Sequence, residues 1–152
     1  MFSTRPLLSK FSRMGTFVPI CKNSVVEPLA LAAVQTDGSF RKNISRTAVI
    51  LDSIQGEQFT LVNTYFTHDN SHESEWCSVL NGLEFSLKKK QLAVTLENDN
   101  QGVIQSLITQ SPPRSLYWPY YDAIFELMNE FDWVSMRWIP RERNKADRLF
   151  RI

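Results

Sequence analysis

The stretch from Leu29 to Ser39, LALAAVQTDGS, constrains the fold more than any other part of the sequence. Its apolar run from Leu29 to Thr36 is short and bounded, which predicts a strand buried inside a sheet. The run ends in Asp37-Gly38-Ser39, a combination typical of turns. We therefore expect a buried strand that closes at Asp37, with this carboxylate at the end of the element.

Two more strands are expected directly after this one. Residues 47–51 (TAVIL) are rich in β-branched side chains, and residues 58–66 (QFTLVNTYF) alternate apolar and polar residues. The segment between them, SIQGE at residues 53–57, is a turn sequence. Three strands joined by short connections predict an antiparallel meander.

The apolar period then changes to that of a helix. After Ser71 the apolar positions follow the spacing of a helix that packs on a sheet, and they are Trp76, Val79, Leu80, Leu83 and Leu87. Three lysines, at residues 88–90, suit the negative C-terminal end of such a helix. A long helix is therefore expected to follow the meander.

The remainder of the chain alternates strands and helices. We expect a buried strand at residues 92–96, a short helix capped by Asn98 and ending near Leu107, a helix at residues 116–131, a strand at residues 133–139 and a short helical tail after Pro140. The order β-β-β-α-β-α-α-β-α predicts the α/β class. The expected architecture is a five-stranded mixed sheet, its first three strands antiparallel, flanked by helices.

Composition limits the kind of protein. The 152 residues, of which 43% are hydrophobic and 22% charged, are enough for one globular domain with its own core. No apolar run approaches the roughly 20 residues of a membrane span, so no membrane segment is expected. Cys21 and Cys77 lie far apart and form no metal-binding spacing, which favours a reducing compartment such as the cytoplasm.

Residues 1–27 differ from the rest of the chain. The charged residues before Glu27 are all basic: Arg5, Lys10, Arg13 and Lys22. This composition fits either a basic N-terminal arm or a targeting segment that resembles a mitochondrial presequence. We therefore expect a domain at residues 28–152, located in the cytoplasm or, if the first segment is a presequence, in the mitochondrial matrix.

Charge is distributed unevenly. Residues 133–152 hold six basic and two acidic residues, whereas residues 27–132 hold seven basic and fourteen acidic ones. An acidic middle region disfavours a nucleic-acid partner unless bound cations neutralise some of the carboxylates. Asp37, Glu75 and Asp99 lie at ends of expected elements, where they can converge on a hard cation such as Mg²⁺. Each acid alone also fits an ordinary turn or helix-terminal position.

Four motifs, taken together and in order, resemble the ribonuclease H type 1 family and its reverse-transcriptase-like relatives. They are Thr36-Asp37-Gly38-Ser39, Glu75 seven residues ahead of Gly82-Leu83, NDNQGV at residues 98–103 and IPRERNKAD at residues 139–147. The likeness covers about residues 30–150. It implies the RNase H-like fold and hydrolysis of the RNA strand of RNA/DNA hybrids with two Mg²⁺ or Mn²⁺ ions.

The resemblance also implies particular site residues. By matching position, the catalytic metal ligands are Asp37, Glu75, Asp99 and Asp147. Gln101 is implied to reach the minor groove of the hybrid, and the further substrate contacts expected are Gly38, Ser39, Ser71, His72, Asn100, Arg141 and Asn144. The alternative is a catalytically weak or silent RNase H-fold module that binds nucleic acid or protein in a larger assembly.

The sequence departs from the family pattern at several positions. Ser71 and His72 stand where the family often has asparagines, which puts recognition of RNA 2′-hydroxyls in doubt. The Asn144–Asp147 interval is one residue shorter than the commoner spacing, and residues 140–144 contain no histidine. The basic handle between the second and third helices is also absent. These departures affect substrate binding and turnover more than the metal cluster.

Overall fold

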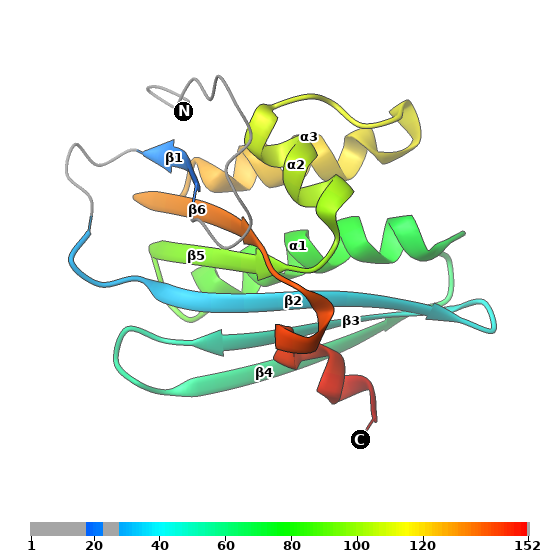
Figure 1. Cartoon of the computed structure of the whole chain (residues 1–152), viewed down its shortest axis with the longest axis horizontal. Coiled ribbons are helices and arrows are strands. Elements are labelled where there is room, and N and C mark those ends of the chain that lie inside the picture. Colours follow the sequence, from blue (N-terminus) through cyan, green and yellow to red (C-terminus); the bar gives the residue numbers. More distant parts are fainter. Residues whose placement is uncertain (1–17, 23–27, 152) are drawn as a thin grey trace.

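The protein is a mixed β-sheet with helices packed against it (Figure 1). The structure, a computed structural model, describes residues 18–22 and 28–151. Its strands are β1 (Val18–Lys22), β2 (Ala32–Arg41), β3 (Ile44–Asp52), β4 (Gln58–Tyr65), β5 (Ala93–Asn98) and β6 (Trp133–Trp138). They lie in the order β1-β6-β5-β2-β3-β4, with β2 parallel to β5 and β5 parallel to β6.

Three α-helices and three short 3₁₀ helices complete the described part of the chain. The α-helices are α1 (Ser71–Lys88), α2 (Gln101–Thr109) and α3 (Trp118–Met128). The 3₁₀ helices are η1 (Ser115–Tyr117), η2 (Arg141–Arg143) and η3 (Lys145–Arg151). No helix among the described residues combines the length and the apolar character that crossing a membrane requires.

The main core lies between one face of the sheet and the helices. Val34, Val49 and Leu96 project from neighbouring strands and are completely buried, together with Leu83 of α1 and Ile124 of α3. Apolar side chains of this size contribute roughly 1.5–3 kcal/mol each when fully buried. This packing fixes α1 across the centre of the sheet.

The opposite face carries a smaller apolar cluster under η3. Ala48 and Ile50 of β3 pack there with Ala146, and Leu149 and Phe150 cover them. Consequently η3 lies across β2 and β3 on the side away from α1, as the red C-terminal residues show in Figure 1. The C-terminal residues thereby pack against β2, the strand that carries Asp37.

The expected five-stranded mixed sheet is confirmed in β4-β3-β2-β5-β6, in which β2, β3 and β4 are antiparallel neighbours. β1 adds a sixth strand, antiparallel to β6, from within residues 1–27. The remaining residues of that range lie outside the described part, so a targeting role there stays a prediction. The sheet is therefore wider than the sequence pattern indicated.

Two expected element boundaries were wrong. β2 does not end at Asp37 but continues to Arg41, because Asp37-Gly38-Ser39 stays paired with β3. The turn falls instead at Lys42 and Asn43, whose φ angles of 52° and 64° form a two-residue hairpin turn. Asn98 is the last residue of β5 rather than a helix cap. Asn100 caps α2, accepting a hydrogen bond from the Val103 amide.

Candidate metal centre

Strand pairing places the first two acids. β2 pairs with β5 only as far as Thr36 opposite Asn98. Asp37 is the next residue on β2, and Asp99 is the residue that follows β5. The two carboxylates therefore leave the sheet at the same point, although the chain between them forms two further strands and a helix. Asp37 is 5% exposed, so its charge is largely removed from water.

Gly38 brings α1 and its glutamate to this point. A Cβ on Gly38 would lie 2.5 Å from the carbonyl carbon of Ser74 and 2.7 Å from the amide nitrogen of Glu75. Only a residue without a side chain lets the first turns of α1 approach β2 so closely. The Gly38 amide donates to both neighbouring carboxylates, at 3.0 Å to Asp37 Oδ1 and 3.2 Å to Glu75 Oε1.

Asn98 anchors the chain that carries Asp99. Its buried amide group donates to the carbonyl of Thr36 at 3.0 Å and to the Thr36 hydroxyl at 2.9 Å. Its Oδ1 accepts from the Asn100 amide at 2.7 Å, which fixes the turn around Asp99. The indole of Trp138 donates to the Asp99 carbonyl at 2.9 Å. The position of this acid is thus set by β2, β5 and β6 together.

Asp37, Glu75 and Asp99 form one cluster of carboxylates. One oxygen of each lies within 4.8 Å of the others. Hard divalent cations such as Mg²⁺ and Mn²⁺ take carboxylate oxygens as ligands, so the donor set fits such ions. Three acids from β2, α1 and the end of β5 therefore constitute an acidic triad suited to metal binding.

The electrostatics of the triad support this interpretation. Burial, together with the charges of Asp99 and Asp147, raises the pKa of Asp37 to about 7, against the Gly38 hydrogen bond and Arg141, which lower it. Burial, together with Asp37 and Asp99, raises the pKa of Glu75 to about 9. Burial also raises the pKa of Asp99. Carboxyls that resist ionisation in this way are relieved by a bound cation.

Asp147 stands apart from the triad. It lines the same cavity, but it is not among the acids whose oxygens gather within metal-binding distance. Its carboxylate instead forms an ion pair with Arg151 one turn further along η3. The four-acid cluster expected from the sequence is therefore a triad with a fourth acid at its rim.

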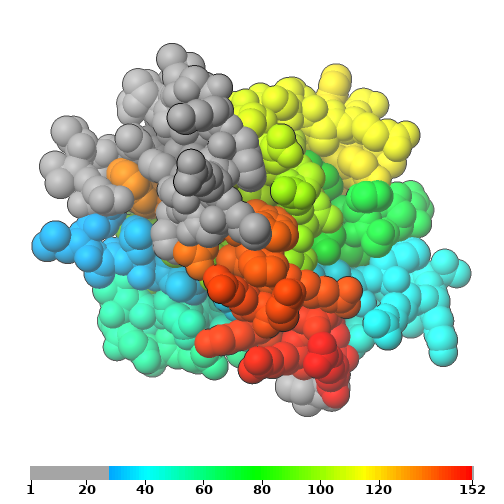
Figure 2. All heavy atoms as spheres, viewed as in Figure 1, coloured from blue at the N-terminus to red at the C-terminus, as the bar shows by residue number. Residues whose placement is uncertain are grey.

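The triad lines a cavity of about 400 Å³. Among the described residues, four arginines line it: Arg41, Arg46, Arg141 and Arg151. Only Arg141 was expected from the sequence. Arg41 and Arg46 enter from the two sides of the β2–β3 hairpin, and Figure 2 shows the cyan hairpin residues beside the red C-terminal residues. The acids are thus surrounded by cations that suit an anionic ligand.

The expected substrate contacts divide into groups. Gly38, Ser39, Ser71 and Arg141 all line the cavity of the triad. His72 and Asn100 lie instead in a neighbouring groove of about 540 Å³, which extends along α2 to residues 111–117. The first turn of α1 contributes to both, with Ser71 lining the cavity and His72 the groove.

Two of the expected contacts have other surroundings. Gln101 is exposed at the start of α2 and lines neither the cavity nor the groove. Asn144 is 3% exposed, and its side chain donates to the Thr36 carbonyl at 2.9 Å and accepts from the Ala146 amide at 3.1 Å. These bonds indicate that Asn144 positions the chain around Asp99 and Asp147, and its contact with a substrate stays a prediction.

This fold and this acidic triad define an RNase H-like domain. Residues 35–149 match the model of the reverse transcriptase-like family, which is most of the chain, and the protein belongs to that family. No curated protein matches the chain in sequence. The family resemblance stated from four motifs is therefore confirmed.

Solved structures agree on the fold. RNase H1 from the halophilic archaeon Halobacterium salinarum is 22% identical with a TM-score of 0.71, over 79% of this chain and 94% of that one. The N-terminal RNase H domain of a Mycobacterium tuberculosis protein is 18% identical with a TM-score of 0.67, over 78% and 88% of the two chains. LC11-RNase H1 in complex with an RNA/DNA hybrid is 17% identical with a TM-score of 0.67, over 78% and 92%.

Proposed function

We propose that the protein is a metal-dependent endoribonuclease that hydrolyses the RNA strand of RNA/DNA hybrids with two Mg²⁺ or Mn²⁺ ions. The observation that carries the proposal is the triad of Asp37, Glu75 and Asp99 inside an arginine-lined cavity. Further support comes from structural similarity to RNase H1 proteins, one of them bound to an RNA/DNA hybrid.

The acids take the metal-binding role in this proposal. Asp37, Glu75 and Asp99 hold the ions, and Asp147 adds a ligand from the rim. Two such ions, when bound, activate the attacking water and stabilise the leaving 3′ oxygen of an in-line displacement at phosphorus. The Gly38 amide and Asn98 keep the carboxylates in place, so the chain's own contribution is pre-organisation of charge.

The arginines take the phosphate-binding role. Arg41, Arg46 and Arg141 lie around the acids and present planar groups of donors that suit phosphate oxygens. The groove beside them, with His72 and Asn100, is available to the rest of the hybrid. This arrangement balances the negative triad with positive charge where a nucleic-acid backbone enters.

A labelled RNA/DNA hybrid tests the proposal. Wild-type protein should cleave its RNA strand in the presence of Mg²⁺ or Mn²⁺, and Asp99→Asn should abolish cleavage while circular dichroism shows the native fold. The matched control is Asp122→Asn, which removes an exposed acid from α3 and should leave cleavage unchanged. If the wild type binds metal but cuts only single-stranded or duplex DNA, the assignment of the substrate is wrong.

The alternative is a silent module that binds nucleic acid or protein in a larger assembly. Two observations favour it: the residues lining the cavity include no histidine, and Asp147 is engaged by Arg151. Carboxylates packed together without a ligand cost stability, which speaks against a silent site. Cleavage of the hybrid by the wild type, lost in Asp99→Asn, decides between the two.

We also propose a cytoplasmic location, with the mitochondrial matrix as the alternative. The basic composition of residues 1–27 supports either interpretation. N-terminal sequencing of the mature protein distinguishes them, because removal of a presequence leaves a chain whose first residue lies downstream of Met1.

A further inference from the structure

The segment that carries Asp147 is bound to the sheet at the start of the segment. Residues 143–151, here called the C-terminal segment, contain η3, which crosses β2 and β3. Ala146 is its completely buried residue, and Lys145 just before it is exposed. This segment contacts β2 through the backbone of Arg143 and Lys145, on either side of Asn144. Lys145 lies two residues before Asp147.

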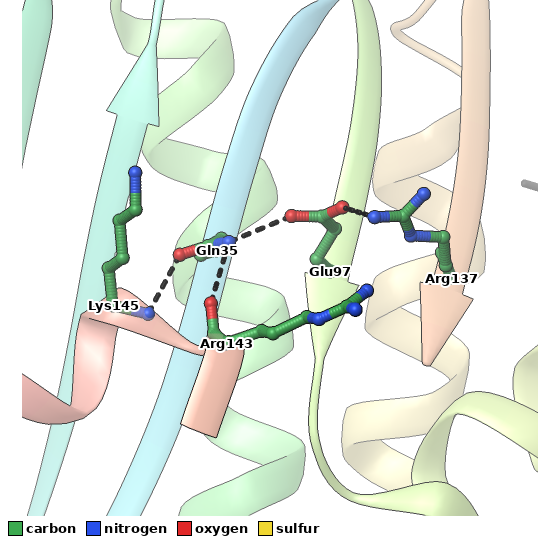
Figure 3. Close-up of polar contacts among 5 residues, drawn as sticks. All are labelled: Gln35, Glu97, Arg137, Arg143 and Lys145. Carbon is green, nitrogen blue, oxygen red and sulfur yellow. Dashed lines mark hydrogen bonds and ion pairs between the residues drawn. The ribbon is translucent and has the colours of Figure 1, made fainter. Parts of the chain in front are cut away.

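A single side chain of β2 holds that backbone. Gln35 Oε1 accepts a hydrogen bond of 2.9 Å from the Lys145 amide, and Gln35 Nε2 donates to the Arg143 carbonyl at 3.4 Å (Figure 3). Gln35 thus contacts the chain on both sides of Asn144. The same Nε2 also donates to Glu97 Oε1 on β5 at 2.8 Å.

Glu97 in turn is fixed from β6. Its second carboxylate oxygen, Oε2, pairs with the guanidinium of Arg137 at 2.9 Å. The side chains of Arg137 and Glu97 are 23% and 11% exposed, so water reaches this pair only in part. Figure 3 shows the resulting line of polar contacts from Arg137 across Glu97 and Gln35 to the backbone at Arg143 and Lys145.

These contacts determine the orientation of the Gln35 side-chain amide. A carboxylate only accepts hydrogen bonds, so Glu97 requires the NH₂ end of Gln35 to face β5. The carbonyl end of Gln35 then faces the Lys145 amide, which needs an acceptor. Glu97 therefore selects the one orientation of Gln35 that holds the C-terminal segment.

We propose that Gln35 and Glu97 are positioning residues that hold Asp147 at the rim of the metal centre. The inference rests on the proposed function for the role of Asp147, but the positioning itself is a property of the chain. Neither side chain lines the cavity of the triad, so both act through the backbone they hold.

Gln35→Leu tests the first contact, because leucine has a similar size and no hydrogen-bonding group. Hydrogen exchange followed by mass spectrometry should show faster exchange in peptides covering residues 143–151, with strands β2 and β5 unchanged. Calorimetric titration should show Mn²⁺ binding weakened by about tenfold, the lower end of the effect of losing a partner that orients a metal ligand. Gln58→Leu is the matched control, since Gln58 on the edge strand β4 bonds the exposed Asp52 carboxylate of β3.

Swapping the glutamine at residue 35 and the glutamate at residue 97 tests the orientation of the residue 35 side chain. Gln35→Glu places two carboxylates against each other and should increase exchange in residues 143–151 more than Gln35→Leu does. Adding Glu97→Gln should restore the protection of the Lys145 amide, because the new amide at residue 97 can donate to the carboxylate at residue 35 and still accept from Arg137. The bond to the Arg143 carbonyl stays lost, since a carboxylate cannot donate. A role that is merely structural gives no such rescue.

The outcomes separate this inference from the proposed function. If wild-type protein fails to cut the hybrid, the proposed function is wrong, while the exchange and Mn²⁺ measurements still judge the positioning. If Gln35→Leu matches the Gln58→Leu control in both measurements, or if the double variant gives no rescue, the positioning inference is overturned even in an active nuclease.

Discussion

At the scale of single residues, the acidic triad contains more negative charge than its neutral partners can balance. One backbone amide, that of Gly38, serves both Asp37 and Glu75. The raised pKa values of these two carboxyls follow from burial and from mutual repulsion. Without a cation, the folded protein therefore keeps protons on acids that would be ionised in the unfolded chain.

This retention of protons predicts an unusual dependence of stability on pH. The folded-state pKa values of about 7 for Asp37 and about 9 for Glu75 lie above the ordinary values of 3.8 and 4.5. The folded state therefore binds more protons than the unfolded state, so stability in EDTA should fall as pH rises from about 5 to 9. The slope is at most about 1.4 kcal/mol per pH unit for each proton retained.

Thermal denaturation in EDTA at a series of pH values measures this effect. Asp37→Asn should give a shallower decline, because it removes one of the retained protons and part of the repulsion on Glu75. A wild-type melting temperature that is constant or rises over this range would contradict the electrostatics described here.

Sequence reasoning identified the acids but not their surroundings. Asp37, Glu75 and Asp99 were found because each belongs to a motif with its own local pattern. Arg41 and Arg46 were missed, since a hairpin brings them to the cavity and neither has a motif. The burial of Asn144 was missed for a similar reason: its hydrogen-bond partner, Thr36, lies 108 residues away.

At the scale of elements, the contact between β2 and the start of α1 is the tightest constraint on the site. Gly38→Ala would place a methyl group 2.6 Å from the Ser74 carbonyl oxygen, which is backbone and cannot turn aside. We expect a loss of about 1–3 kcal/mol of stability from this overpacking and weaker Mn²⁺ binding, because Glu75 moves with the helix. Chemical denaturation and calorimetric titration measure the two effects.

Gly102→Ala is the control for that variant. The added methyl group would meet Asn100 Oδ1 at 3.5 Å, an ordinary contact, and alanine favours the helix. Its stability should equal or exceed that of the wild type. Equal losses in the two variants would show that the close approach at residue 38 is not specific.

A second element-scale prediction concerns the start of α2. Asn100 was expected to contact substrate, and its Oδ1 accepts from the Val103 amide at 3.0 Å as the helix cap. Asn100→Ala should lower stability by about 1 kcal/mol, whereas Asn100→Ser should retain most of it because serine also caps helices. Urea denaturation of both variants measures this difference, and an equal loss in the two would contradict the capping role.

The sequence predicted which strands and helices form better than it predicted where the strands end. The apolar run before Asp37 correctly predicted β2, but the turn sequence within it was overridden by pairing with β3. β1 was not expected because it gains its partners only from β6, more than 110 residues later in the chain. Local patterns do not contain such long-range pairing.

At the scale of the whole molecule, occupation of the metal centre should stabilise the entire fold. Ions that bind only the folded state add RT ln(1 + [L]/Kd), or about 2.7 kcal/mol at a hundredfold excess over Kd. The melting temperature should therefore rise steadily with Mg²⁺ or Mn²⁺ at pH 7.5, and Asp99→Asn should reduce the rise. Differential scanning fluorimetry measures both, and a wild type that does not respond would favour the silent module.

The parallel pairing of β2 with β5 has a kinetic consequence. Thr36 and Asn98 are 62 residues apart, and the chain must close this long loop before Asp37 and Asp99 become neighbours. Parallel contacts of such separation form slowly during folding. Metal ions can bind only after these contacts have formed. They should therefore leave the refolding rate almost unchanged and should stabilise the protein by slowing its unfolding.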